Sequence, residues 1–319
     1  VKAAAAGVAR GPTACPNGLR TLERMQVASK GAASSYQALG SLTWERGRGS
    51  SLVWRKGHSA LVTFAAGKKP RQVPLPGSGY GAQLIRRGDA IYVASVHAPR
   101  SRGKKRVPPT IVVTRHTPSG KARWRRVLSG PGGVNNSKPR VALGDSGLFV
   151  LWEHWPTYGN DNNLQWALLA PPTGKVTFRR QGVGPGVPSD SHPGLVALGQ
   201  GYHVIYSPSR GPMGMAPGPR LLSIDRRGKV AFRTPRLKFA GPGFDMVAHG
   251  ERLAVACSSR RGPSRGQIRW FLMDPSASIV AGPVVVSQGM GSRNRKPRIT
   301  WDARTGLSAV AWEVHPART

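Results

Sequence analysis

The stretch SKPRVALGDSGLFVLWE, residues 137–153, returns twice further along the chain. The later copies are SHPGLVALGQGYHVIYS at 191–207 and RKPRITWDARTGLSAVAWE at 295–313. Each copy has a polar approach with Lys-Pro or His-Pro, a short apolar strand, a glycine-containing turn and a second apolar strand that ends at or near Trp or Tyr. A hairpin that recurs at a regular interval indicates a repeat architecture.

Two series of regularly spaced strand-ending residues define the repeat. The second strand of each hairpin ends at one of six residues that are 51 to 57 positions apart: Trp44, Ser95, Trp152, Tyr206, Cys257 and Trp312. Between these residues lie further hairpins, each two apolar runs around a polar turn. They end at Phe64, Trp124, Phe178 and Phe232, and a looser copy covers 268–280. Each unit therefore has four strands, two inner and two outer, and such units arranged radially form a β-propeller.

The sequence predicts an all-β protein, a single β-propeller domain over 1–319 with repeats of about 54 residues from 31 onward. Six blades are preferred. The chain stops after an inner hairpin, so the N-terminal arm, 1–30, is expected to supply the missing outer strands and to close the ring in one shared blade. The stretch LRTLERMQV at 19–27 is a candidate closing strand, or a short helix. In a five-bladed alternative, 1–45 form an arm and SLVWRKGHSALVTF, 51–64, completes the last blade.

The charge of the chain is strongly positive: 48 Lys and Arg against 13 Asp and Glu give a net charge of +35. Such a field favours an anionic polymer (a cell-surface glycan, lipopolysaccharide or nucleic acid) or an acidic protein as partner, and a place in a larger assembly is a further alternative. An arginine-rich surface that reflects composition alone is the alternative. Cys15 and Cys257 are candidates for one disulfide, and two free thiols fit equally well. The sequence lacks an apolar run long enough for a membrane-spanning helix, and export to the periplasm, cell surface or medium is expected.

The repeats resemble those of secreted bacterial propellers of the sialidase-like type, in which a first strand opens near Pro and a second ends in Trp-Glu. The Asp-box of that family has its nearest match in SIDRRGKVAF, 223–232, with Asp225 and Gly228. This copy has one extra residue and lacks the Thr-Trp ending. The resemblance implies the architecture, whereas the catalytic residues of the family have no match in this sequence.

One face of such a propeller carries the connections into first strands and out of second strands, where ligands usually bind. A set of basic residues is expected there as a ligand-binding surface, with Arg298 beside it: Arg100, Arg102, Lys104, Lys105, Arg106, Lys138, Arg260, Arg261 and Lys296. Guanidinium groups from separate loops can hold phosphate, sulfate or carboxylate groups. The outer strands are basic too, so the charge is not confined to this face.

The connection HWPTYGNDNN, 154–163, differs from the others because it is aromatic and amide-rich. A sugar ring can stack on an aromatic side chain while amide and carboxylate groups take its hydroxyls. Its candidate ligand-binding residues are His154, Trp155, Tyr158, Asn160 and Asp161. Such residues are also common in ordinary turns.

The few acidic residues offer a second hypothesis. Glu45, Glu153 and Glu313 end second strands in this interpretation, and Asp190 and Asp245 precede or open first strands. Paired carboxyl groups near the axis could hydrolyse glycosides, with Glu153, Asp190, Asp245 and Glu313 as the catalytic candidates. Recurrence at equivalent positions instead favours a structural role. No metal or other cofactor is expected, since H-E-x-x-H and C-x-x-C motifs are absent from the sequence.

The preferred function is a non-catalytic binding or scaffold protein, a basic propeller that docks onto an anionic polymer or an acidic partner. The alternative is a glycan-active hydrolase or lectin with an axial acidic and aromatic site.

Overall fold

The computed structural model describes residues 42–45, 48–55, 58–65, 71–75, 82–97, 108–128, 135–155, 163–183, 193–207, 219–233, 237, 243–259, 266–287, 293–302 and 306–315. All regular secondary structure in these ranges is β-strand. The first eleven strands are β1 (Leu42–Glu45), β2 (Arg48–Arg55), β3 (His58–Ala65), β4 (Arg71–Leu75), β5 (Gln83–Arg87), β6 (Ala90–His97), β7 (Thr110–His116), β8 (Ala122–Leu128), β9 (Asn135–Gly144), β10 (Gly147–Trp155) and β11 (Asn163–Leu169). The others are β12 (Val176–Val183), β13 (Gly194–Leu198), β14 (Gly201–Tyr206), β15 (Arg220–Ile224), β16 (Val230–Arg233), β17 (Phe244–His249), β18 (Arg252–Ser258), β19 (Ile268–Met273), β20 (Ile279–Val285), β21 (Arg293–Asp302) and β22 (Leu307–His315).

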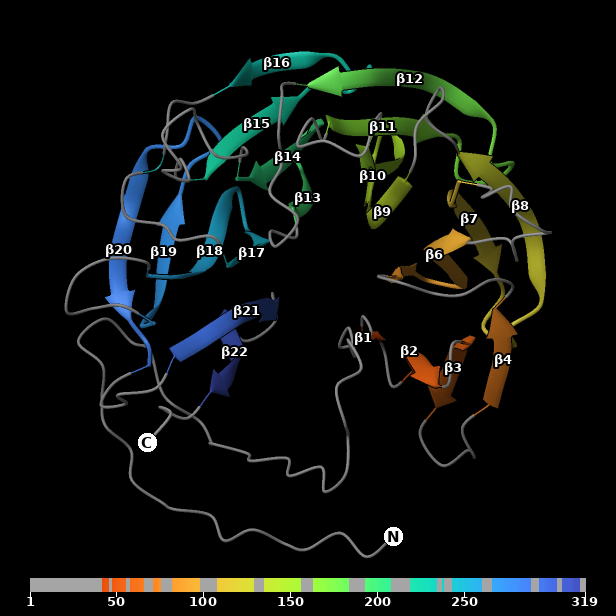
Figure 1. Cartoon of the computed structure of the whole chain (residues 1–319), viewed down its shortest axis with the longest axis horizontal. Coiled ribbons are helices and arrows are strands. Elements are labelled where there is room, and N and C mark those ends of the chain that lie inside the picture. The colour runs from red at the N-terminus through yellow and green to blue at the C-terminus, as the bar shows by residue number, and fades with distance from the viewer. Residues whose placement is uncertain are drawn as a thin grey trace, which may run out of the picture.

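Each sheet is built from strands that are consecutive in sequence and pair with their neighbours. Within the described ranges, the four-stranded sheets are β1–β4, β5–β8, β9–β12, β13–β16 and β17–β20, and β21–β22 form a two-stranded sheet. The pairings inside the β9–β12 sheet are antiparallel, as they are in the others. The sheets follow one another around a common centre, with β9, β13 and β17 toward it and β8, β12, β16 and β20 at the rim (Figure 1). This is the arrangement of a β-propeller, as the repeats predict.

The repeated stretches are the inner hairpins of their sheets. Residues 137–153 fall on β9–β10, 191–207 on β13–β14, and 295–313 on β21–β22. The second series is also confirmed from Trp124 onward, because β7–β8, β11–β12, β15–β16 and β19–β20 are the outer hairpins. The sequence pattern thus identifies both halves of these units.

The first unit differs from the prediction. Trp44 lies in β1, the first strand of its sheet, and not at the end of a second strand. SLVWRKGHSALVTF forms β2–β3, the middle pair, with Leu52 opposite Leu61. The outermost strand is β4, whose sequence RQVPL contains Pro74. Proline is tolerated on an edge strand because one side of that strand lacks a pairing partner, and this is the strand that pattern reading missed. Glu45 consequently ends a first strand, so its backbone position is at the opposite end of the molecule from that of Glu153, which lies near the end of a second strand.

Antiparallel pairing gives the molecule two distinct ends. The tight connections between first and second strands, such as 145–146, and between third and fourth strands, such as 225–229, lie at one end, which we call the turn end. First strands begin and second strands finish at the other, which we call the loop end. Within the described ranges, no helix has the length and apolar character needed to cross a membrane.

The core lies between neighbouring sheets, and it includes residues that were predicted to end second strands. Trp152 is fully buried against the β5–β8 sheet, in a cluster with Tyr92 and Val113. Tyr206 is buried against β9–β12 beside Trp166. Cys257 is buried in the cluster between β13–β16 and β17–β20; its suggested partner Cys15 lies outside the described residues, so the disulfide stays a prediction.

A second contact between sheets joins an outer aromatic ring to a glycine turn of the next sheet. Trp124 covers Gly174, and its Nε1 donates a hydrogen bond to Pro171 O at 3.0 Å. Phe178 covers Gly228 in the same way one sheet later. Both glycines have positive φ, 67° and 83°, a conformation that glycine adopts without strain. The spacing of Trp124 and Phe178 therefore has a physical basis, since each ring covers a turn of the next sheet.

Candidate functional site

Equivalent positions at the start of the inner strands bring polar side chains to the loop end. Strand pairing aligns five such positions, four of them polar and one a glycine, each opposite a small or aliphatic residue of the second strand: Gln83, Arg140, Gly194, Asp245 and Arg298. Three of the side chains bond to the next inner strand. Gln83 Oε1 accepts from Val141 N at 2.7 Å, Arg140 Nε donates to Pro193 O at 2.7 Å, and Asp245 Oδ2 accepts from Ile299 N at 3.2 Å. These bonds hold the inner strands together around the centre.

The β9–β10 hairpin has an irregularity that shapes the site. Its register shifts between Leu151 and Glu153, and Lys138, on the facing strand, has a φ of 48°. A lysine in the left-handed region is uncommon, and such strained residues concentrate at functional sites. The same register shift occurs in β21–β22, between Arg295 and Arg298. Residues 137–140 and 295–298 are thus equivalent.

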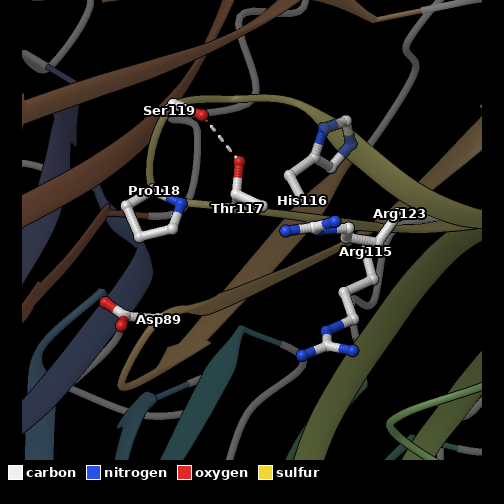
Figure 2. Close-up of a pocket in the computed structure, with 7 residues that line it drawn as sticks. All are labelled: Asp89, Arg115, His116, Thr117, Pro118, Ser119 and Arg123. Atoms are coloured by element: carbon white, nitrogen blue, oxygen red, sulfur yellow. Dashed lines mark hydrogen bonds between the residues drawn. The ribbon is translucent and has the colours of Figure 1, made fainter.

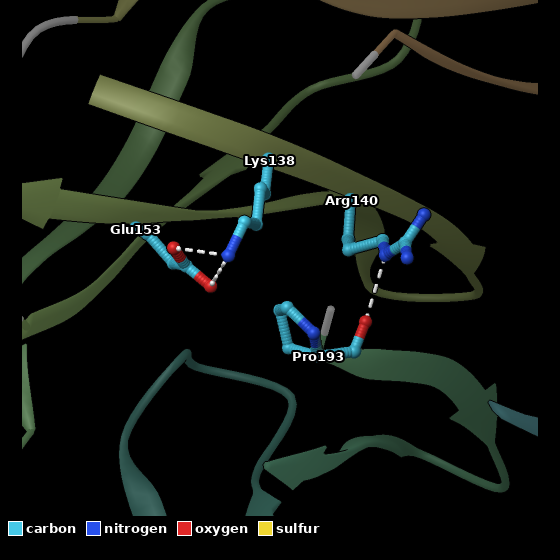
Figure 3. A network of polar contacts seen from close by, with 4 residues as sticks. All are labelled: Lys138, Arg140, Glu153 and Pro193. Atoms are coloured by element: carbon cyan, nitrogen blue, oxygen red, sulfur yellow. Dashed lines mark hydrogen bonds and ion pairs between the residues drawn. The ribbon is translucent and has the colours of Figure 1, made fainter. Parts of the chain in front are cut away.

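The shift places a carboxyl group in the interior beside an ammonium group. Lys138 Nζ lies 3.1 Å from Glu153 Oε2 and 3.3 Å from Oε1 (Figure 3). The Glu153 side chain is fully buried, whereas that of Lys138 is 16% exposed. Burial disfavours the charged carboxylate and raises the pKa of Glu153 to about 8, although Lys138 and Arg140 act in the opposite direction. Burial therefore favours the protonated form of Glu153, which Lys138 and Arg140 oppose.

Arg140 connects this pair to the neighbouring strands. Burial, and then the positive charge of Arg298, lower the pKa of Arg140 to about 10, while Asp245 and Glu153 oppose that change. Charged groups from β9, β10, β17 and β21 are therefore close enough to influence one another. Figure 3 shows the Arg140 side chain with its bond to Pro193, next to the Lys138–Glu153 pair. We call the five residues Lys138, Arg140, Glu153, Asp245 and Arg298 the axial cluster.

His154, the first residue of the aromatic and amide-rich connection 154–163, has a structural role. His154 is 3% exposed, and its Nδ1 lies 3.0 Å from Asn136 Oδ1. Asn136 Nδ2 in turn donates to Pro109 O at 2.7 Å. Burial lowers the pKa of His154. His154 thus fixes the end of β10 to the preceding sheet, and Trp155 beside it is half-buried.

A separate pocket opens at the turn end, away from the axial cluster. It has a volume of about 450 Å³ and is lined by Asp89, Arg115, His116, Thr117, Pro118, Ser119 and Arg123 (Figure 2). All of these residues belong to the β5–β8 sheet and its turns. Pattern reading did not single out any of them.

The predicted site residues are placed as follows. Lys138, Glu153 and Asp245 belong to the axial cluster, and His154 and Trp155 lie near it on β10. Lys296 and Glu313 lie in β21 and β22, and only their backbone positions are described. The other predicted residues lie outside the described ranges: Arg100, Arg102, Lys104, Lys105, Arg106, Tyr158, Asn160, Asp161, Asp190, Arg260 and Arg261.

Arg140 is the functional candidate that sequence reasoning missed. Its signal was present, because Arg140 and Arg298 occupy the same place in two copies of Lys-Pro-Arg. Within the described ranges, no group of three or more His, Cys, Asp or Glu residues is arranged to hold a metal ion.

Comparisons with known proteins place the fold. No family model matches the chain, and no curated protein matches it. A solved structure of a neuraminidase-like protein from A/bat/Guatemala/164/2009 has 10% identity and a TM-score of 0.50, over 85% of this chain and 86% of that one. Similarity at this level supports the propeller fold.

Two glycoside hydrolase structures match less well. An exo-beta-1,3-galactanase from Phanerochaete chrysosporium has 13% identity and a TM-score of 0.48, over 85% of this chain and 66% of that one. A Bombyx mori GH32 beta-fructofuranosidase has 9% identity and a TM-score of 0.44, over 76% of this chain and 61% of that one. This chain therefore spans less than two thirds of the length of either protein.

These comparisons correct the preferred function. We expected a non-catalytic binding or scaffold protein, and the similar structures are instead glycoside hydrolases and a neuraminidase-like protein. The physical reason for the error is that net charge describes how a protein associates and carries no information on whether its fold holds a reactive site.

Proposed function

We propose that this protein is a glycan-active hydrolase whose site is the axial cluster at the loop end. The observation that carries the proposal is that two carboxyl groups from different sheets, Glu153 and Asp245, both act on Arg140, while Lys138 on the same strand and Arg298 on β21 add two further cationic groups. Glycoside hydrolysis uses a pair of carboxyl groups, one of which must donate a proton. Environments that keep one carboxyl protonated at neutral pH are typical of such acids.

In this proposal the two carboxyl groups have different roles. Glu153 supplies the proton, because burial raises its pKa to about 8. Asp245 is half-buried on β17 and acts as the second carboxyl, held in place by the N–H of Ile299. Glu153 is fully buried beneath Lys138, so Lys138 must move aside when substrate binds.

The charge of the cluster indicates a class of substrate. Lys138, Arg140 and Arg298 bring three positive charges, which Asp245 and a protonated Glu153 do not balance. Guanidinium groups bind carboxylate and sulfate groups well. We therefore propose an anionic glycan, with affinity that falls as salt rises.

The test is turnover of a panel of neutral and acidic oligosaccharides by the wild-type protein and by E153Q and D245N. Both variants should lose activity by at least 100-fold, because general acid–base catalysis contributes roughly 10²–10⁴-fold. D225N is the matched control: Asp225 lies in a turn at the turn end, where its Oδ1 accepts from Arg227 N and Lys229 N. It should retain activity.

The pH profile provides a second readout. Activity should fall as pH rises through about 8, where Glu153 loses its proton. Lys138 lowers the pKa of Glu153, so K138M should move that alkaline limb to higher pH. Absence of turnover on the whole panel, or normal activity of E153Q and D245N, would contradict the proposal. Binding of a glycan without turnover would make the site a lectin.

The number of blades and the closure of the ring are also part of this proposal. We infer six blades, since β1–β4 form a sheet of their own and β21–β22 form another. The outer strands that complete the β21–β22 blade would come from the N-terminal arm, 1–30. Deleting 1–30 should then leave an unpaired strand edge and cause aggregation; a monomeric truncated protein would contradict this closure. Export is also proposed, and the test is recovery of the native protein outside the cytoplasm.

A further inference from the structure

The pocket at the turn end of the β5–β8 sheet interrupts the repeat. The outer hairpins β7–β8, β11–β12, β15–β16 and β19–β20 share one register irregularity, so their positions can be aligned residue by residue. Arg115 corresponds to Leu168, Ser223 and Leu272 in the later sheets. His116 corresponds to Leu169, Ile224 and Met273, and Arg123 to Thr177, Ala231 and Val280.

The neighbouring position is aromatic in three of the four hairpins. Trp124 corresponds to Phe178 and Phe232 in the next two sheets and to Ala281 in the β17–β20 sheet, and the Trp124 and Phe178 rings pack against the following glycine turns. Among the four aligned outer hairpins, Arg115, His116 and Arg123 occur together only in β7–β8. Contact between blades uses one N–H group of Arg115 and does not account for Arg123, and all three residues line the same pocket.

The walls of the pocket are held in place by hydrogen bonds. Thr117 Oγ1 lies 2.8 Å from Ser119 Oγ and accepts from Lys121 N at 3.1 Å. His116 is 3% exposed, and its Nδ1 and Nε2 contact Gly120 O at 3.1 Å and Thr114 Oγ1 at 2.8 Å. Arg115 Nη1 donates to Pro172 O of the next sheet at 3.2 Å. A site whose groups are already fixed loses little entropy on binding.

The polar groups suit an anion that carries hydroxyls. Figure 2 shows the Arg115 and Arg123 side chains beside the 117–119 turn, with Asp89 also at the pocket. Two guanidinium groups against one carboxylate leave the pocket with excess positive charge. Guanidinium groups bind oxyanions through paired N–H donors, and Thr117, Ser119 and Asp89 offer partners for sugar hydroxyls.

We propose that this pocket binds a small oxyanion, namely the phosphate, sulfate or carboxylate group of a sugar derivative. The site is distinct from the axial cluster, since it lies at the opposite end of the molecule and on another sheet. It is independent of the proposed hydrolysis and would hold a ligand even in a protein without turnover.

The experiment is isothermal titration calorimetry of the full chain at 150 mM NaCl with four probes: inorganic phosphate, inorganic sulfate, glucose 6-phosphate and glucose. R123A is the main variant, because Arg123 is exposed and its loss should leave folding intact. R227A is the matched control, since Arg227 is an exposed arginine on the equivalent turn of the β13–β16 sheet and removes the same charge. Thermal unfolding of each variant checks that it is folded.

We expect saturable binding of the phosphate probes, at least tenfold weaker in R123A and within twofold of wild type in R227A, as the loss of one charged hydrogen bond implies. R115K, which keeps the charge and loses the planar fork, should also weaken binding. Tighter binding of glucose 6-phosphate than of phosphate identifies a sugar derivative as the ligand, and equal binding identifies the oxyanion alone. Equal losses in R123A and R227A, no saturable binding, or binding of glucose as tight as that of glucose 6-phosphate would overturn the proposal.

Discussion

Replacement of Gly228 by alanine should destabilise the protein through the ring that covers it. Gly228 ends the tight turn between β15 and β16, with a φ of 83°. A Cβ at this position would lie 2.4 Å from Phe178 Cδ1, 2.9 Å from Cγ and 3.0 Å from Cε1. Carbon atoms in good contact are about 3.5–4.0 Å apart, so the ring would have to move.

Two costs add up in this variant. An L-residue in the left-handed region costs roughly 1–2 kcal/mol relative to its favoured conformations. Overpacking of a well-filled contact costs roughly 1–3 kcal/mol. The free energy of unfolding of G228A should therefore fall by about 2–5 kcal/mol.

Urea denaturation followed by tryptophan fluorescence measures this change. G199A is the control, because Gly199 has a φ of 56° and an added Cβ would meet nothing within 4 Å. G199A should show the backbone cost alone, and the excess in G228A is the cost of the Phe178 contact. In an F178A background that excess should disappear. Equal destabilisation by G228A and G199A would refute the reasoning.

Three further changes probe the other contacts. Burial raises the pKa of Glu153 to about 8, so the folded state retains a proton that the unfolded state loses above pH ~4.3. The stability that this group contributes is full below that pH and declines toward pH 8, by on the order of 1 kcal/mol per pH unit. Urea titrations from pH 4.5 to 8 should therefore show a steeper decline in wild type than in E153Q, and parallel curves would contradict this prediction. A277G should raise the free energy of unfolding by up to about 1 kcal/mol, because Ala277 has a φ of 71°; a lower melting temperature would contradict this. W166F removes the 2.9 Å hydrogen bond from Trp166 Nε1 to the Gly228 carbonyl and should cost about 1–3 kcal/mol, and an unchanged unfolding midpoint would show that the bond contributes little.

The fold was predictable where the repeat is regular. Hairpins such as 137–153 bury one face of each strand against a neighbouring sheet, and alternating apolar residues with a glycine turn encode that arrangement directly. Trp152 and Tyr206 could be assigned to the core because large rings at equivalent positions must pack between sheets. The prediction for the first unit was wrong. The short connection between β2 and β3 has the sequence pattern of an outer hairpin, and Pro74 made β4 hard to identify as a strand.

The candidate site was only partly predictable, because burial is a property of the assembled sheets. The sequence placed Glu153 at the end of a second strand, and nothing local revealed that Lys138 would cover it. Arg140 stood in the opening stretch, but its interaction with Arg298 and Asp245 depends on three inner strands meeting. Such long-range contacts leave no spacing signal in a single sequence.

Comparing equivalent positions in the repeated hairpins distinguishes structural residues from functional ones better than residue type or charge does. Trp124 and Phe178 occupy equivalent positions because each ring covers a glycine turn of the next sheet, so this recurrence marks structure. Arg115 has only Leu or Ser as counterparts, so another requirement must explain it. The Lys138–Glu153 pair is intermediate, because the strand register gives it one equivalent, Lys296 and Glu313, and the other inner hairpins lack it. A purely structural pair would be needed in every sheet, and a purely accidental one would not bring the same register shift with it twice. The pair is thus neither required in every sheet nor confined to one, and the E153Q and K138M measurements decide whether Lys138 and Glu153 act in the axial cluster or only stabilise their hairpin.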